Sequence, residues 1–345
     1  MKKILLALLL LCLLINSHVY SQKAAFDKRK FFEDTTILNA TLTTDITHLF
    51  RQRGKQNKQF DGHFITSLPG MDSIDVPVTL ELRGHMRKDY CNIPPVRIHF
   101  KGDKKTVLSS LGTLKLVNQC MTTPTDGQYL IKEFLIYKMY NMLSDLSFRV
   151  RLLRLNLMDS SKRKTTTEYA FLVEDVKDVA KRNYCKEVKT NIKLNELQTD
   201  REQTTTVAIF EYMIGNTDWG VGANHNTRLV IPDIDSGVVR PYIVPYDFDY
   251  SGLVNTNYAV PDEELGIQNV RERLYRGFSR SMEELNATLD VFKKQKDNIY
   301  SLINNSNLLT SPSKKDMNYY LDDFYNTIKD QGAIKSTFIN NARTE

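Results

Sequence analysis

The chain has 345 residues, of which 41% are hydrophobic and 26% charged, so it is long enough to form two lobes or one large domain with its own core. The formal net charge of +6 is modest, and basic residues are interspersed with acidic ones. This distribution argues against the dense basic face of a nucleic-acid-binding protein.

The first 21 residues predict a secretory signal peptide. Lys2 and Lys3 precede the apolar run of residues 4–15, which is too short to span a bilayer, and Ser21 closes a plausible cleavage site. We therefore expect cleavage near Gln22 and export to the periplasm, the outer surface or the medium. No later apolar run has the length of a membrane span, so none is expected.

The part of the chain from residue 22 to residue 175 predicts a β-rich lobe. Alternation of apolar and polar residues predicts strands at residues 37–43, 76–83, 96–101, 113–118, 148–158 and 169–174. Between them, residues 128–145 carry apolar side chains at helical spacing and predict one long helix with a broad buried face. The strands are expected to form an antiparallel sheet.

The part from residue 176 to residue 345 predicts a mainly helical lobe. Residues 176–206 are polar and suit a connection between lobes, and two short strands flank the turn at residues 232–237. Helical spacing recurs at residues 207–214, 270–278, 282–304 and 316–340. The expected fold class is therefore α+β with a two-lobed layout.

Two acidic clusters in the second half are the sharpest functional signal. Asp218, Asn224 and Asn226 follow a predicted helix, and Asp247 and Asp249 follow an apolar run that predicts a short buried strand. Side chains at the ends of two elements can converge, and converging Asp and Asn oxygens hold Mg²⁺ against a polyphosphate. One alternative is that the first cluster is an ordinary polar loop. Another is that the second only caps a helix or meets an arginine.

Four charged residues elsewhere are candidates for contacts with a nucleotide. Lys115 lies within a predicted strand, with Lys101 as its rival, and it faces either solvent or phosphates. Arg97 belongs to a group of arginines suited to forked contacts with phosphate oxygens, or else to an ordinary basic hairpin. Glu133 lies on the long helix, where it holds such a lysine or pairs with a surface one, and Glu174 ends an apolar strand.

Three cysteines remain after cleavage of the signal peptide. In the oxidising compartment that an exported chain meets, we predict that Cys91 and Cys120 form a disulfide; the alternative is that they and Cys185 are three buried free thiols. No second Cys or His stands at the spacing of a zinc site.

The order of these motifs resembles that of the spore coat protein H (CotH-like) kinases. The segment Arg83-Gly84-His85, followed by Pro94-Pro95-Val96-Arg97, is similar to the Arg-Gly-Asn and Pro-Lys-Lys-Ser motifs of that family. Asp218-Trp219 with Asn224 and Asn226 resembles its Asp-Trp-Pro and Asn-Asn loop, and Asp247-Phe248-Asp249 its Asp-Leu-Asp strand end. The likeness covers roughly residues 75–255. The whole chain resembles uncharacterised exported bacterial proteins of that type.

The resemblance implies an atypical protein-kinase-like fold and ATP-dependent phosphorylation of an exported protein or small molecule. Asp218 would orient the acceptor hydroxyl, Asn226 and Asp247, with Asp249 beside them, would hold Mg²⁺ or Mn²⁺, and Lys115 would bind phosphates. His85 replaces the family's Asn, and the lysine pair is absent.

Two other functions remain open. The chain could be a non-catalytic envelope or surface protein that keeps the fold without the chemistry. It could also be a metal-dependent phosphoesterase that uses Asp218, His225, Asp247 and Asp249.

Overall fold

The computed structural model describes residues 28–53, 58–68, 72–84, 86–102, 106–234 and 237–344, so the predicted signal peptide and His85 lie outside it. The chain divides into two compact units. Unit 1 comprises Met1–Val117 and Arg151–Leu172, and unit 2 comprises Asn118–Val150 and Val173–Glu345. Within the described ranges, no helix is both long enough and apolar enough to cross a membrane.

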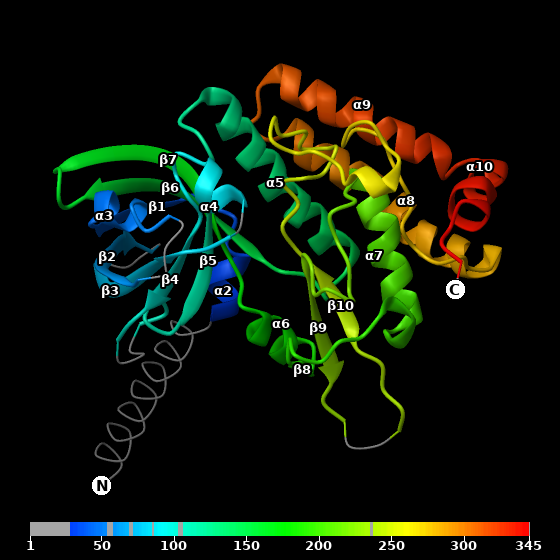
Figure 1. Ribbon diagram of the computed structural model, residues 1–345, viewed down its shortest axis with the longest axis horizontal. Coiled ribbons are helices and arrows are strands. Elements are labelled where there is room, and N and C mark those ends of the chain that lie inside the picture. Colours follow the sequence, from blue (N-terminus) through cyan, green and yellow to red (C-terminus); the bar gives the residue numbers. More distant parts are fainter. Residues whose placement is uncertain are drawn as a thin grey trace, which may run out of the picture. The chain divides into compact units, whose positions relative to one another are not determined.

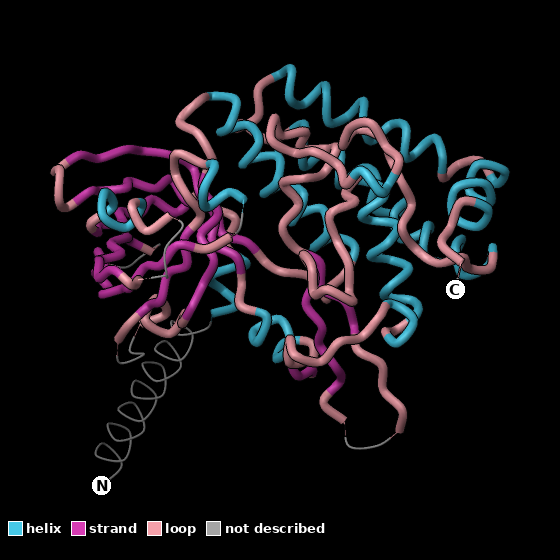
Figure 2. Tube along the Cα trace, viewed as in Figure 1, coloured by secondary structure: helices cyan, strands magenta, loops and turns pink. Residues whose placement is uncertain are grey.

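Unit 1 is built on a closed barrel of seven strands (Figures 1 and 2). The strands are β1 (Leu38–Thr44), β2 (Phe60–Ser67), β3 (Ser73–Leu82), β4 (Val96–Phe100), β5 (Thr113–Asn118), β6 (Val150–Asp159) and β7 (Lys164–Val173). Three short helices accompany them: α2 (Lys28–Glu33), α3 (Ile46–Phe50) and α4 (Met86–Tyr90). The order around the barrel is β1-β2-β3-β4-β5-β7-β6.

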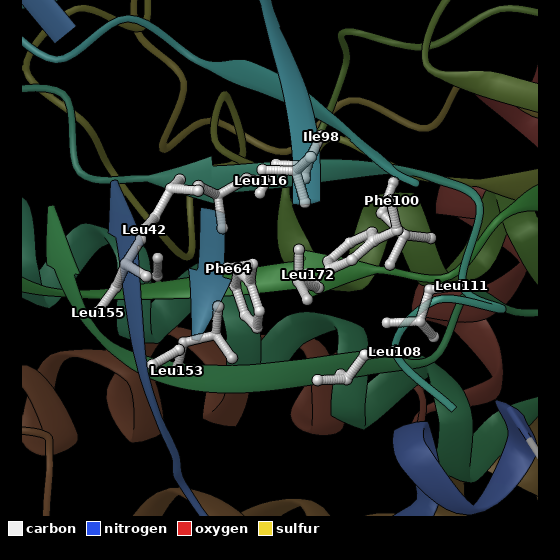
Figure 3. Close-up of a cluster of buried hydrophobic side chains, with 14 of the residues drawn as sticks. Leu42, Phe64, Ile98, Phe100, Leu108, Leu111, Leu116, Leu153, Leu155 and Leu172 are labelled. Atoms are coloured by element: carbon white, nitrogen blue, oxygen red, sulfur yellow. The ribbon is translucent and has the colours of Figure 1, made fainter. Parts of the chain in front are cut away.

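The inward side chains of alternate strand positions fill the barrel. Phe64 and Ile98 are fully buried, and Figure 3 shows them among leucines contributed by several strands. The Phe64 and Phe100 rings meet edge to face, with centroids 5.2 Å apart. The barrel interior is therefore a packed core.

Unit 2 combines helices with a small sheet of order β10-β9-β8. Its strands are β8 (Cys185–Glu187), β9 (Thr227–Pro232) and β10 (Tyr242–Pro245). Its longer helices are α5 (Pro124–Leu143), α7 (Arg201–Ile214), α8 (Met282–Asn304) and α9 (Ser311–Thr327). Shorter ones are α6 (Val176–Arg182), η1 (Glu196–Gln198), η2 (Glu263–Leu265), α10 (Gln331–Lys335) and η3 (Ser336–Asn340).

The prediction of a two-lobed protein-kinase-like fold, with a β-rich N-lobe, one long helix and a mainly helical C-lobe, is wrong. The strands of unit 1 close into a barrel because β1 pairs in parallel with β6, for example Leu38 with Leu153. The long helix α5 belongs to unit 2, which also contains α7, α8, α9 and the small sheet. Hydrophobic alternation predicts strands, but a parallel partner far along the chain leaves no local signal.

Several individual helices lie where the sequence predicted them. The predicted helix at residues 282–304 is confirmed as α8, and the long helix is confirmed as α5. The predicted helix at residues 270–278 is wrong, since this segment is irregular. Cys91 and Cys120 are both disulfide-bonded, and Cys185 is a free, buried thiol.

The barrel core makes a direct stability prediction. Phe64→Ala removes a fully buried ring and its contact with Phe100, and it should lower the free energy of unfolding by about 3–5 kcal/mol. The matched control is His63→Ala, because His63 lies next to Phe64 in β2 but is exposed. His63→Ala should lower the free energy of unfolding by less than about 1 kcal/mol. Urea denaturation followed by far-ultraviolet circular dichroism measures both; similar losses would contradict the assignment of Phe64 to the core.

Candidate functional site

The first acidic cluster lies in the loop that follows helix α7. The helix begins at Asp200, whose side chain accepts a hydrogen bond from the Gln203 amide, and it ends at Gly215, which has a left-handed conformation with φ of 66°. A side chain at Gly215 would collide with the Tyr320 hydroxyl. A glycine is therefore required where the chain leaves the helix.

Residues 216–226, here called the acidic loop, fold back on themselves. The backbones of Gly220 and His225 exchange two hydrogen bonds, of 3.0 and 2.9 Å. Asn224 and Asn226 both have positive φ, at 50° and 49°. Asparagine tolerates this conformation better than most residues, but two such residues within three positions mark a constrained backbone.

The Asp218 carboxylate is the centre of the loop. His225 Nε2 lies 2.6 Å from Asp218 Oδ1, and the Asn226 side-chain amide donates to Asp218 Oδ2 and to the Asp218 carbonyl, each at 2.8 Å. About a third of the Asp218 side chain and half of the His225 side chain are exposed, at 35% and 53%. The pair is thus oriented by the protein and open to solvent.

The second acidic cluster is tied directly to this loop. The Tyr246 amide donates to the Asn226 carbonyl at 2.9 Å, and the Asp247 amide donates to the Tyr137 hydroxyl at 2.9 Å. Asp247 has φ of 67°, again in the left-handed region. Asn226 is therefore hydrogen-bonded both to Asp218 and to the residue preceding Asp247, so the structure brings together three of the residues selected from the sequence.

The remaining candidates of unit 2 have structural partners. Asp249 is buried, and its carboxylate accepts a hydrogen bond from the Tyr258 hydroxyl at 2.9 Å. Glu174 forms a buried ion pair with Arg182 at 3.2 Å and accepts from the Arg149 amide. Burial raises the pKa of Glu174. Glu133 is buried on α5.

Arg97 and Lys115 belong to unit 1. They are paired on adjacent strands β4 and β5, at positions that alternate with buried ones and so lie on the outer side of the barrel. Arg97 also forms an ion pair with Glu81, at 2.6 Å. Lys101, the alternative to Lys115, pairs with Asp61 at an exposed surface, at 2.9 Å.

A pocket of about 400 Å³ opens beside the acidic loop. It is lined by Thr217, Asp218, Trp219, Gly220, Ala223, His225, Tyr250, Val260, Pro261, Asp262, Leu265, Val270 and Arg276. Its size and its mixture of apolar walls with a few charged groups are typical of a small-molecule or side-chain binding site.

Arg276 lines this pocket and binds the backbone of the acidic loop. Its Nη1 donates to the carbonyls of Thr217 and Trp219, the latter at 2.6 Å, and its guanidinium lies 5.9 Å from the centre of the Trp219 ring. These two carbonyls flank Asp218. The sequence suggested an arginine only as a possible partner for the second acidic cluster, and no local pattern shows that Arg276 binds backbone carbonyls.

Glu211 is a buried acid next to the acidic loop that the sequence analysis did not single out. It is buried on α7, its Oε2 accepts from the Asn216 side-chain amide at 2.9 Å, and its Oε1 has no partner among the described residues. Burial raises its pKa to about 8, with a further upward contribution from Asp218. The available signal was its position on the apolar face of α7, four residues after Val207 and three before Ile214.

The donor set limits what metal the site could hold. Among the described residues, no three His, Cys, Asp or Glu side chains are grouped as metal ligands. A carboxylate and an amide oxygen, from Asp247 and Asn226, suit a cation such as Mg²⁺ that keeps water and phosphate ligands. They do not suit a cation that needs a complete set of protein ligands, as a two-metal phosphoesterase would.

Comparison of the sequence with protein-family models and with curated proteins finds no match. The site is therefore described by its own geometry: an oriented Asp–His pair in a pocket, an asparagine that joins it to Asp247, and a buried acid beneath.

The buried acid predicts how stability depends on pH. The native Glu211 carboxyl keeps its proton up to a pKa of about 8, whereas the ordinary value is 4.5, so the native state binds more protons in between. The free energy of unfolding therefore falls as pH rises from 4.5 to 8. Glu211→Gln has no proton to lose, and at pH 8 it should be more stable than the wild type by several kcal/mol, at about 1.4 kcal/mol per pKa unit.

Chemical denaturation at a series of pH values measures this difference. Glu202→Gln is the control, because Glu202 lies on the same helix but is exposed. It should leave the pH dependence of the wild type unchanged. If Glu211→Gln follows the same pH dependence as the wild type, Glu211 is ionised in the native state at neutral pH and the prediction fails.

Proposed function

We propose that the acidic loop and its pocket form the active site of an exported enzyme that transfers a phosphoryl group from ATP to the hydroxyl of a protein or small molecule. The observation that carries this proposal is the position of Asn226, which is hydrogen-bonded to the Asp218 carboxylate and to the backbone next to Asp247. Phosphoryl transfer requires positioning and charge stabilisation more than covalent chemistry, so a rigid set of oxygen ligands beside an acid suits it.

The Asp218–His225 pair suits the acceptor side of the reaction. A hydroxyl in the pocket would meet a carboxylate that His225 and Asn226 hold in place. Asp218 would orient that hydroxyl, and the pair would take up its proton as the hydroxyl oxygen bonds to the γ-phosphorus and the bond from that phosphorus to ADP breaks, so that ADP leaves. The apolar walls of the pocket, including Trp219 and Val260, would bind the rest of the acceptor.

Asn226 and Asp247 have the side chains needed to bind the metal ion that accompanies ATP. Because the Asn226 amide nitrogen donates to Asp218, its carbonyl oxygen is directed elsewhere and is available as a ligand. Together with the Asp247 carboxylate it would hold Mg²⁺ or Mn²⁺, which would neutralise charge on the phosphates of ATP.

Binding is tested first. The purified mature chain should gain thermal stability in the presence of Mg²⁺ and ATP together, because a ligand of the native state stabilises it by about 2.7 kcal/mol at 100 times its Kd. Mg²⁺ alone should give no shift, since the protein supplies few ligands. Asp247→Ala should abolish the shift, and Glu263→Gln, at an exposed acid near the pocket, should keep it. A wild type that does not respond would contradict the proposed binding of ATP and would leave the non-catalytic protein and the phosphoesterase.

Transfer is tested separately with ATP labelled at the γ-phosphate and a mixture of exported proteins and small hydroxyl compounds. Asp218→Asn should lower the rate of label transfer by about 10²–10⁴-fold, because it removes the carboxylate that receives or orients the acceptor proton. Equal incorporation by the wild type and the variant would remove Asp218 from the chemistry. Release of free phosphate without transfer would favour the phosphoesterase instead.

Export is a further part of the proposal. The signal-like N-terminus predicts it, and the disulfide-bonded state of Cys91 and Cys120 is typical of an oxidising compartment. Expression of the full chain in a secreting bacterial host should yield a protein outside the cytoplasm whose N-terminal residue, found by sequencing, is close to Gln22. An intact N-terminus in the cytoplasmic fraction would contradict export.

A further inference from the structure

Two consecutive hydrogen bonds connect the acidic loop to a buried acid on helix α7, and the proposed reaction does not use them. The Glu211 carboxyl accepts a hydrogen bond from the Asn216 side-chain amide, and the Asn216 side-chain carbonyl accepts one from the Asp218 backbone amide at 3.1 Å. Asn216 is almost completely buried, with 1% exposed. The position of Asp218 is therefore connected to the state of an acid in the protein interior.

Three ionisable side chains face Glu211: burial and the Asp218 charge raise its pKa, whereas the Arg276 charge and the hydrogen bond from Asn216 lower it. These side chains are Tyr140 from α5, Asp218 from the acidic loop and Arg276 from the segment that follows η2. Burial raises the pKa of Tyr140, so this hydroxyl stays neutral. The Arg276 guanidinium is the only cation of the three, and its Nη1 is engaged with the carbonyls of Thr217 and Trp219.

We propose that Glu211 is a positioning residue that works as a proton-operated switch: while Glu211 is a neutral acid, Arg276 stays on the carbonyls that flank Asp218, and loss of the Glu211 proton to the solvent shifts the acidic loop. The catalytic meaning of this switch rests on the proposed function. The coupling between the proton and the loop does not.

Two physical effects follow from ionisation. A second negative charge in the interior repels the Asp218 carboxylate, because a buried pair of like charges is screened poorly. The same charge attracts the Arg276 guanidinium away from the carbonyls of Thr217 and Trp219. Both effects disturb the backbone on either side of Asp218, so the loop changes its conformation when Glu211 loses its proton.

The chain contains a built-in probe of this movement. Trp219 is its only tryptophan, it is buried with 3% exposed, and it lies next to Asp218 with Arg276 against its ring. Its fluorescence therefore reports the loop without interference from any other tryptophan. Neither ATP nor a metal is needed, so the result is independent of whether the protein transfers phosphate.

The experiment is a fluorescence titration of the folded protein over about two pH units on either side of the Glu211 pKa of about 8. The wild type should show one transition in Trp219 emission, half complete near pH 8, and Glu211→Gln should show none. His225→Gln should keep the transition, which excludes the other ionisable partner of Asp218. A transition that persists in Glu211→Gln, or its absence from the wild type, would overturn the proposal.

A second measurement requires no substitution and covers the case in which Glu211→Gln fails to fold. Infrared titration of the wild type should show the band of a neutral buried carboxylic acid at pH 7 and its loss with the same midpoint as the fluorescence change. A fluorescence transition without a matching carboxyl band would assign the movement to another group. If phosphoryl transfer is also observed, its rate should fall through this transition in the wild type but not in Glu211→Gln.

Discussion

The hydrogen bonds from Arg276 to the carbonyls of Thr217 and Trp219 are the constraint on which the site depends. They hold the backbone on both sides of Asp218, so the carboxylate between them can be aimed at a pocket. A loop of this length would otherwise sample many conformations, and each ordered residue costs about 1–2 kcal/mol of backbone entropy. A cation that binds carbonyls supplies this order without neutralising the acid that the site exposes.

Two neighbouring arginines extend the same arrangement. Arg271 donates to the Gly252 carbonyl and pairs with Asp316, and Arg273 donates to the carbonyls of Met213 and Tyr320. One irregular segment thus binds the end of α7, the acidic loop and the chain after Asp249. The segment at residues 270–278 is irregular although its apolar spacing suggests a helix, and its arginines bond to backbone carbonyls of other segments. Burial lowers the pKa of Arg273 and of Arg276, yet an arginine keeps its charge in such a setting.

The elements that the sequence predicted well are those that carry their own start and stop signals. Helix α8 has a complete capping box, in which Ser281 and Glu284 exchange side-chain and backbone hydrogen bonds, and its expected bounds match those observed. The barrel carries no comparable signal. Its closure depends on β1 lying parallel to β6, with Leu38 opposite Leu153, and a pairing across more than a hundred residues is invisible to local periodicity. The kinase-like fold class failed at this step, although most of the strands within it were located correctly.

The candidate site divides in the same way. Asp218, Asn226 and Asp247 were found because each lies near the end of a regular element: Asp218 follows α7, Asn226 precedes β9 and Asp247 follows β10. Glu211 was missed because a single acid on an apolar helix face is usually interpreted as a partly exposed residue at the edge of that face. Only the tertiary structure shows that it is buried. Its contacts in the folded protein distinguish it. Asn216 donates a hydrogen bond to one of its oxygens, and the charges of Asp218 and Arg276, from other segments, shift its pKa. Local sequence therefore indicates which groups are candidates for contact with a ligand, whereas the buried groups that pack against them are defined only by the tertiary structure.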